Sequence, residues 1–334
     1  MKKKKKFVEL DEKYYKEKKP KNPLEITKNI QKIEGDVNLI TLPKISFFVM
    51  QIKNNYQKKY SIYNKENFEL IQDFEFNDKL DKIEIMNENA IIFYGYYMEI
   101  WIKNKGNIFV KNKTISIDIT SNILINSKSS LLLYAETDSI LVWYIKENIP
   151  QNIITKIKIR YYKTNLFFIN NEQLLGVHIY HDYSSNIYFL QMKDFSIVKK
   201  INITEKVGED FKLRLYEKVN ISKIDENKII CVYRKFNKNK TFFITIKIPE
   251  FIIGHKNKEN SIFDFIIYKN YILFYTWDKK IKIYENSKCK LVQEINVKGF
   301  FSMIHLKDNY LLGSMTEYAA QKDLKSLVLF QLNL

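Results

Sequence analysis

The segment His178-Ile179-Tyr180-His181-Asp182 contains the only close pair among the four histidines of this chain. Two imidazoles and a nearby carboxylate are common ligands of a zinc ion. The segment alternates as a strand does, however, and a spacing of three residues places the two imidazoles on opposite faces of a strand. They would share one metal ion only if the strand bends. We therefore expect surface or turn histidines here, and no metal site.

Other groups for catalysis are few. His255 and His305 are isolated, and no Ser, His and Asp arrangement or Cys/His pairing stands in a recognisable context. With 8 glycines in the chain, no Gly-rich phosphate loop is present. Cys231 and Cys289 are too far apart in sequence to indicate a disulfide framework, which fits a reducing compartment, the cytoplasm or the nucleus. The sequence therefore predicts a protein that is not an enzyme and needs no cofactor.

Net charge is the clearest signal for binding. The formal net charge is +17, and the densest run of lysines is Lys2, Lys3, Lys4, Lys5 and Lys6. A basic surface suits acidic partners, such as nucleic acid, anionic lipid or an acidic patch on a protein. The alternative is a lysine-biased composition that only solvates the surface, because arginine is scarce. Residues 7–12 supply no apolar core for a signal peptide, and no apolar run approaches the ~18 residues that span a bilayer.

A short apolar pattern that returns seven times indicates how the chain is organised. Its first and third positions are apolar and its fourth is usually aromatic, at residues 60–63, 98–101, 140–143, 187–190, 242–245, 281–284 and 327–330. The mean separation of about 44 residues is typical of four-stranded propeller blades. The aromatic fourth positions share the period of the blades, so we expect them to pack between adjacent blades rather than to stack on bases.

Each repeat reads as four short strands, as in residues 263–267, 271–276, 280–284 and 291–297. The last repeat has room for only three strands, and an isolated strand-like run at residues 24–30 would complete it. Such closure removes exposed sheet edges. We therefore predict an all-β fold, a seven-bladed β-propeller of four-stranded antiparallel blades over residues 24–334, after a basic, disordered tail at 1–23. The predicted blades are 37–76, 81–118, 121–160, 165–203, 212–250, 261–297, and 299–334 plus 24–32.

The segment from Thr276 to Glu285, TWDKKIKIYE, resembles a WD repeat. Asp278 matches the turn Asp of that family, which accepts hydrogen bonds that pin the turn, and Tyr284-Glu285 stand where the Trp-Asp dipeptide would be. Asp138 marks a second, fainter match. The blades lack an opening Gly-His dipeptide, and the only one, Gly254-His255, is predicted to follow an outer strand. The resemblance implies a non-catalytic platform for protein assembly.

We expect an intracellular, monomeric propeller that acts as a scaffold and binds proteins with acidic patches through its rim loops. The best loop candidates are 204–211, 234–240 and 318–325, and the candidate partner-binding residues are Trp277, Arg234, Lys235 and Tyr318. Trp277 either anchors a partner or covers a neighbouring blade. A ribonucleoprotein component that uses the basic surface is the first alternative. A propeller enzyme with a site in the central channel is the second, and it carries less weight.

Overall fold

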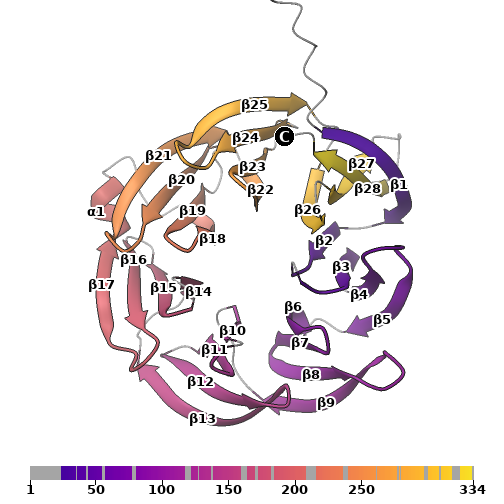
Figure 1. Ribbon diagram of the computed structural model, residues 1–334, viewed down its shortest axis with the longest axis horizontal. Coiled ribbons are helices and arrows are strands. Elements are labelled where there is room, and N and C mark those ends of the chain that lie inside the picture. The colour runs from indigo at the N-terminus through magenta and orange to yellow at the C-terminus, as the bar shows by residue number, and fades with distance from the viewer. Residues whose placement is uncertain are drawn as a thin grey trace, which may run out of the picture.

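The apolar runs of this chain form the strands β1 to β28, and one short helix, α1, interrupts them. The computed structural model arranges the strands as a ring of seven blades around a central channel (Figure 1). It describes residues 24–34, 36–42, 44–54, 57–76, 80–116, 122–126, 128–136, 138–158, 164–169, 172–181, 184–207, 216–235, 240–260, 262–276, 278, 280–296, 300–307, 310–317 and 324–332. The predicted basic tail, residues 1–23, lies outside them.

In every blade, four antiparallel strands follow one another from the channel outward. Blade 1 comprises β2 (Asp36–Ile40), β3 (Phe47–Asn54), β4 (Gln57–Asn64) and β5 (Leu70–Phe76), and blade 2 comprises β6 (Leu80–Asn87), β7 (Ala90–Gly95), β8 (Tyr97–Lys103) and β9 (Phe109–Ser116). Blade 3 comprises β10 (Leu124–Asn126), β11 (Leu131–Ala135), β12 (Ser139–Lys146) and β13 (Ile149–Lys158), and blade 4 comprises β14 (Thr164–Ile169), β15 (Leu174–His181), β16 (Ser184–Gln191) and β17 (Ile197–Asn202).

The remaining blades repeat this order. Blade 5 comprises β18 (Tyr216–Asp225), β19 (Lys228–Lys235), β20 (Lys240–Lys247) and β21 (Ile252–Asn260), and blade 6 comprises β22 (Ile262–Tyr268), β23 (Tyr271–Thr276), β24 (Lys280–Glu285) and β25 (Lys290–Asn296). Blade 7 comprises β26 (Phe300–Lys307), β27 (Tyr310–Glu317), β28 (Leu324–Leu332) and, on the outside, β1 (Leu24–Glu34). The seven-bladed, all-β prediction is confirmed.

The N-terminal strand closes the ring. β1 pairs antiparallel with β28, from Leu24 opposite Leu332 to Glu34 opposite Leu324, and Figure 1 shows β1 outside β28. Two register shifts interrupt this pairing. The closure that the short last repeat predicted is therefore confirmed, and a strand from the start of the chain protects what would otherwise be the open edge of blade 7.

The core lies between the blades. Second and third strands are covered on both faces, so that Ala90 to Tyr94 of β7 are all buried. Outer strands have one face in solvent, and in β9 only Phe109 is buried. Strands covered on both faces read as continuous apolar runs, whereas half-exposed strands alternate. The repeated motif lies on the third strand of every blade, which explains why it is the strongest signal in the sequence.

Aromatic residues at the fourth motif position pack against the preceding blade, as expected. The Trp101 ring of blade 2 contacts Phe74 of blade 1, with ring centroids 4.9 Å apart. The Tyr284 ring of blade 6 lies 5.6 Å from Phe243 of blade 5. Phe330 of blade 7 belongs to an apolar cluster with residues of blade 6. These rings therefore seal the joints between blades.

A β-bulge on the outer strand lies opposite the third and fourth motif positions. In six blades the extra outer-strand residue lies between the partners of two consecutive third-strand residues. These third-strand pairs are Ile62 and Tyr63, Ile100 and Trp101, Val142 and Trp143, Phe189 and Leu190, Ile283 and Tyr284, and Leu329 and Phe330. In blade 5 it lies opposite Thr245 and Ile246. The equivalent third position there is thus Thr245, and our alignment on Ile244 is wrong by one residue.

The reason is the burial of β20 on both faces. Phe242 and Ile244 face blade 4, while Phe243 faces blade 6. All three are apolar, so the sequence carries no alternation to set the register. A shift of one residue exchanges the two faces of a strand, and only the packing against the neighbouring blades distinguishes them.

Blade 5 also extends further than predicted. Its outer strand, β21, begins at Ile252, beyond the predicted limit at residue 250, and contains Gly254-His255, which we expected to follow an outer strand. The sequence of this strand is mostly polar, and Ile252 and Gly254 at its start are exposed, so it has little apolar periodicity. The predicted loop at residues 204–211 also differs in part, because α1 (Ile203–Val207) occupies its start, with Asn202 Oδ1 accepting the Glu205 amide at 3.3 Å.

Candidate interaction surfaces

The antiparallel strands divide the connections between two rims. Connections from second to third strands and from blade to blade lie on one rim, here called the loop rim; turns between first and second and between third and fourth strands lie on the other, the turn rim. Arg234 and Lys235 end β19 at the loop rim. Trp277 and Tyr318 lie outside the described residues. All three predicted binding loops belong to connections of the loop rim.

The two predicted turn aspartates also follow second strands. Asp138 accepts a hydrogen bond from Ser139 Oγ at 3.0 Å, and Lys156 Nζ lies 3.7 Å from its carboxylate. Asp278 is exposed. At that turn the hydroxyl of Thr276 donates to the carbonyl of Lys280 at 3.0 Å. A pinning role for Asp278 and Asp138 stays a prediction.

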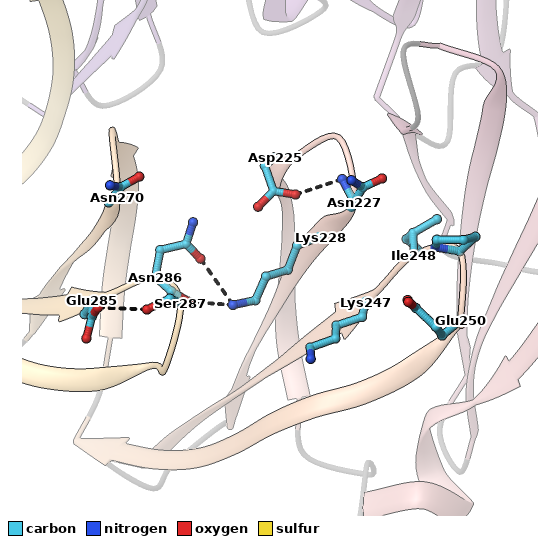
Figure 2. Close-up of a pocket in the computed structure, with 11 residues that line it drawn as sticks. Asp225, Asn227, Lys228, Lys247, Ile248, Glu250, Asn270, Glu285, Asn286 and Ser287 are labelled. Carbon is cyan, nitrogen blue, oxygen red and sulfur yellow. Dashed lines mark hydrogen bonds between the residues drawn. The ribbon is translucent and has the colours of Figure 1, made fainter.

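A hollow of about 540 Å³ opens on the turn rim between blades 5 and 6 (Figure 2). Two turns of each blade form its walls, with the lining residues Asp225, Asn227, Lys228, Lys247, Ile248, Pro249, Glu250, Asn270, Glu285, Asn286 and Ser287. The Lys228 ammonium donates to the backbone carbonyl and to Oδ1 of Asn286, which joins the two blades. Asp225 accepts the Asn227 amide at 2.8 Å, and Glu285 accepts the Ser287 hydroxyl at 2.8 Å.

A second hollow, of about 350 Å³, lies among the inner strands at the channel and is lined by Asn122, Asn165, Leu166, Ile221, Ser222, Asp264 and Phe265. Asn122 exchanges two hydrogen bonds of 2.8 Å with the backbone of Leu166 and so ties blade 3 to blade 4. Asp264 accepts the amide of Phe265 at 2.9 Å. The described lining offers amides, a hydroxyl and one carboxylate, and among these residues no histidine, cysteine or lysine could serve as base or nucleophile.

His178 is buried in the core, contrary to our expectation of a surface or turn histidine. Its Nε2 lies 2.7 Å from Ser185 Oγ, and Tyr233 OH lies 3.5 Å from the same hydroxyl. Both His178 and Ser185 are 0% exposed. Burial lowers the pKa of His178 to about 3, so the imidazole is neutral. The side chain of its sequence partner, His181, lies outside the described side chains.

No protein-family model matches the chain, and no curated protein sequence matches it either. Among solved structures, the Cps50 (Swd1) beta-propeller domain of Myceliophteria thermophila is similar, with a TM-score of 0.62 and 10% sequence identity over 92% of this chain and 99% of that one. The shared fold is a β-propeller, and in this chain it has seven blades. At this identity, the similarity concerns the arrangement of the blades alone.

Sequence reasoning missed the lysines of the turn-rim hollow in this propeller. A signal was present, because Lys228 begins a second strand. The second strands of the other six blades begin with an apolar or aromatic residue, at Phe47, Ala90, Leu131, Leu174, Tyr271 and Tyr310. Lys228 is nevertheless 7% exposed. A lysine at a position that the other blades fill with apolar side chains marks blade 5 as different.

Within the described ranges of the propeller, no group of three or more His, Cys, Asp or Glu side chains is placed to hold a metal ion. The same ranges contain no helix of the length and apolar character that a membrane crossing requires.

Proposed function

We propose that this propeller is a non-catalytic scaffold that assembles a multiprotein complex through its rims, in the cytoplasm or the nucleus. The observation that carries the proposal is where the polar groups lie. The serine–histidine pair is sealed in the core, whereas the mixed-charge hollow opens at the surface. A ring of blades holds its rim connections in place without constraining their sequence, which suits a protein that binds partners.

The loop rim contributes Arg234 and Lys235, and we propose that they bind acidic patches on partner proteins together with Trp277 and Tyr318. A positively charged edge steers association with an acidic surface and sets which partner is accepted. The lysines at positions 2–6 would extend the same attraction. Asp278 and Asp138 would hold their turns, rather than contact a partner.

Affinity purification of the full chain from native cells, with and without RNase, followed by mass spectrometry, tests the scaffold. We expect a stable set of proteins that survives RNase and is depleted when Arg234 and Lys235 are both replaced by Glu. A matched control is Lys199→Glu with Lys200→Glu, because both lysines are exposed in the middle of the outer strand β17, between the two rims. A set that disappears with RNase would contradict the scaffold and favour the ribonucleoprotein alternative.

A further inference from the structure

Two lysines face one another across the turn-rim hollow. Lys228 begins β19 and Lys247 ends β20, and the two are direct partners in the antiparallel register. Both line the hollow, and in Figure 2 both side chains extend into the space between the turns of blades 5 and 6. Like charges directly opposite one another on paired strands are destabilising. Such a pair therefore calls for a compensating negative charge.

Three carboxylates line the same hollow, but none of the described ones pairs directly with either lysine. Lys228 is bound by the carbonyl and amide oxygens of Asn286, which are neutral acceptors. Among the described residues, no ion pair joins Lys228 or Lys247 to a carboxylate. A buried ammonium is normally paired with an anion. Lys228 is 7% exposed and has no such pairing among the described residues, and a bound anion would supply it.

His255, on the adjacent strand β21, is affected by the positive charges of the same two lysines. The pKa of His255 on β21 is lowered, first by burial and then by the charges of Lys228 and Lys247. The three carboxylates of the lining, Asp225, Glu250 and Glu285, are not among the causes. Asp225 and Glu285 accept hydrogen bonds within their own turns. The hollow thus combines two ammonium groups on directly paired strand positions with three carboxylates in its lining.

We propose that the hollow between blades 5 and 6 binds a peptide segment of a partner protein and pairs a carboxylate of that segment with Lys228 and Lys247. This proposal deepens the scaffold function and rests on it. The volume of about 540 Å³ lies in the range of ligand sites. Pro249, which is exposed, offers an apolar contact for a side chain beside the carboxylate.

The three carboxylates of the lining favour a peptide over nucleic acid. A polyanion would bring successive phosphates against Asp225, Glu250 and Glu285, and like charges in contact oppose binding. A peptide with one acidic residue, flanked by neutral or basic ones, can pair its single carboxylate with the lysines and set its other residues beside the lining carboxylates. The hollow should therefore select peptides with an isolated Asp or Glu and reject runs of acidic residues.

Selection from a library of displayed ten-residue peptides on the immobilised full chain tests the proposal. We expect enriched peptides to share an isolated Asp or Glu and to bind Lys247→Glu at least roughly tenfold more weakly, because a charge reversal turns attraction into repulsion. Lys247 is exposed, so this change should leave the fold intact. Lys146→Glu is the matched control, because Lys146 ends the third strand of blade 3 and is also exposed.

The outcomes separate this proposal from the scaffold function. Peptides that bind Lys247→Glu as well as the unaltered chain, or that carry no acidic residue, would overturn the peptide site and leave the scaffold standing. Loss of all native partners in the purification above would contradict the scaffold itself. Tighter binding of single-stranded RNA or inorganic phosphate than of peptides, lost in Lys247→Glu, would also overturn the proposal and assign the lysines to phosphate.

Discussion

At the scale of single residues, the pair His178 and Ser185 has the spacing that general-base activation of a serine requires, with Nε2 and Oγ 2.7 Å apart. Both residues are 0% exposed, so no substrate reaches the hydroxyl. The amide of Ser185 donates to Thr204 Oγ1 at 2.9 Å, which ties β16 to α1. The pair therefore satisfies buried polar atoms and holds neighbouring elements together.

This burial makes stability depend on acid. The pKa of His178 is about 3 in the folded chain and near 6.5 ordinarily. Between these pH values only the unfolded chain takes up the proton. The free energy of unfolding is therefore unaffected by His178 above pH 6.5 and falls by about 1.4 kcal/mol per pH unit as the pH drops toward 3. Chemical denaturation at several pH values should show that the free energy of unfolding of His178→Gln decreases less steeply with acid than that of the unaltered chain. Identical slopes would refute the assignment.

Glu84 on the inner strand β6 has the opposite dependence. Burial raises its pKa to about 8 from 4.5. The folded chain then binds the extra proton, so stability is full below pH 4.5 and falls as pH rises toward 8. Glu84→Gln cannot ionise and should be more stable than the unaltered chain at pH 8 by up to about 3 kcal/mol, with no gain at pH 4. Urea midpoints at the two pH values measure this, and an equal shift at both would contradict it.

Gly176 leaves room for an aromatic ring on the adjacent strand. It pairs with Phe167, and a Cβ at Gly176 would lie 2.1 Å from Cζ of that ring. Gly176→Ala should therefore lower the free energy of unfolding by about 1–3 kcal/mol, the usual cost of overpacking. Gly106→Ala is the control, because its nearest atom, Asn104 Oδ1, is 3.3 Å away on an exposed turn. Equal thermal melting of the two variants would show that the ring moves aside freely.

At the scale of elements, blades 5 and 6 are joined by an ion pair as well as by aromatic rings. Glu259 on β21 of blade 5 accepts hydrogen bonds from Lys282 and Tyr284 on β24 of blade 6. Burial lowers the pKa of Lys282, but Glu259 and Glu294 outweigh this and raise it. The side chains of Lys282 and Glu259 are 10% and 13% exposed, so water screens the pair poorly.

Loss of one buried partner leaves the other charge uncompensated. Glu259→Gln should therefore cost about 2–4 kcal/mol of unfolding free energy, with little dependence on salt. Glu294→Gln is the matched control, because Glu294 contacts the same lysine at 3.5 Å from a more exposed position, where about 1 kcal/mol or less is expected. Guanidinium or urea titrations distinguish the two. A larger loss for Glu294→Gln would contradict the account.

At the scale of the whole molecule, closure depends on β1. Without residues 24–34, β28 becomes an exposed edge that invites pairing with other chains. A chain that starts at residue 36 should therefore melt roughly 5 °C or more below the full chain and form oligomers. A chain that starts at residue 24 is the control and should stay monomeric with an unchanged melting temperature. Light scattering and calorimetry measure both, and identical behaviour of the two truncations would refute the role of β1.

The apolar motif was sufficient to predict the number of blades and the closing strand, because each occurrence lies on a third strand that is buried on both faces. The same burial hid the register of β20, where Phe242, Phe243 and Ile244 are all apolar. Outer strands such as β21 were placed poorly, because exposure removes the constraint on their residue types.

The candidate binding site, unlike the fold, was only partly predictable from the sequence. Local sequence pointed to the loop rim, since turns with Trp277, Arg234 and Lys235 are recognisable by composition. The register of β19 against β20 places Lys228 opposite Lys247 within blade 5, and only the packing of blade 5 against blade 6 brings Asn286 to the same hollow. Periodicity along a chain records which residues must be buried and therefore determines a repeat fold. The meeting of polar groups from different repeats depends on tertiary structure, because their spacing in sequence carries no physical constraint.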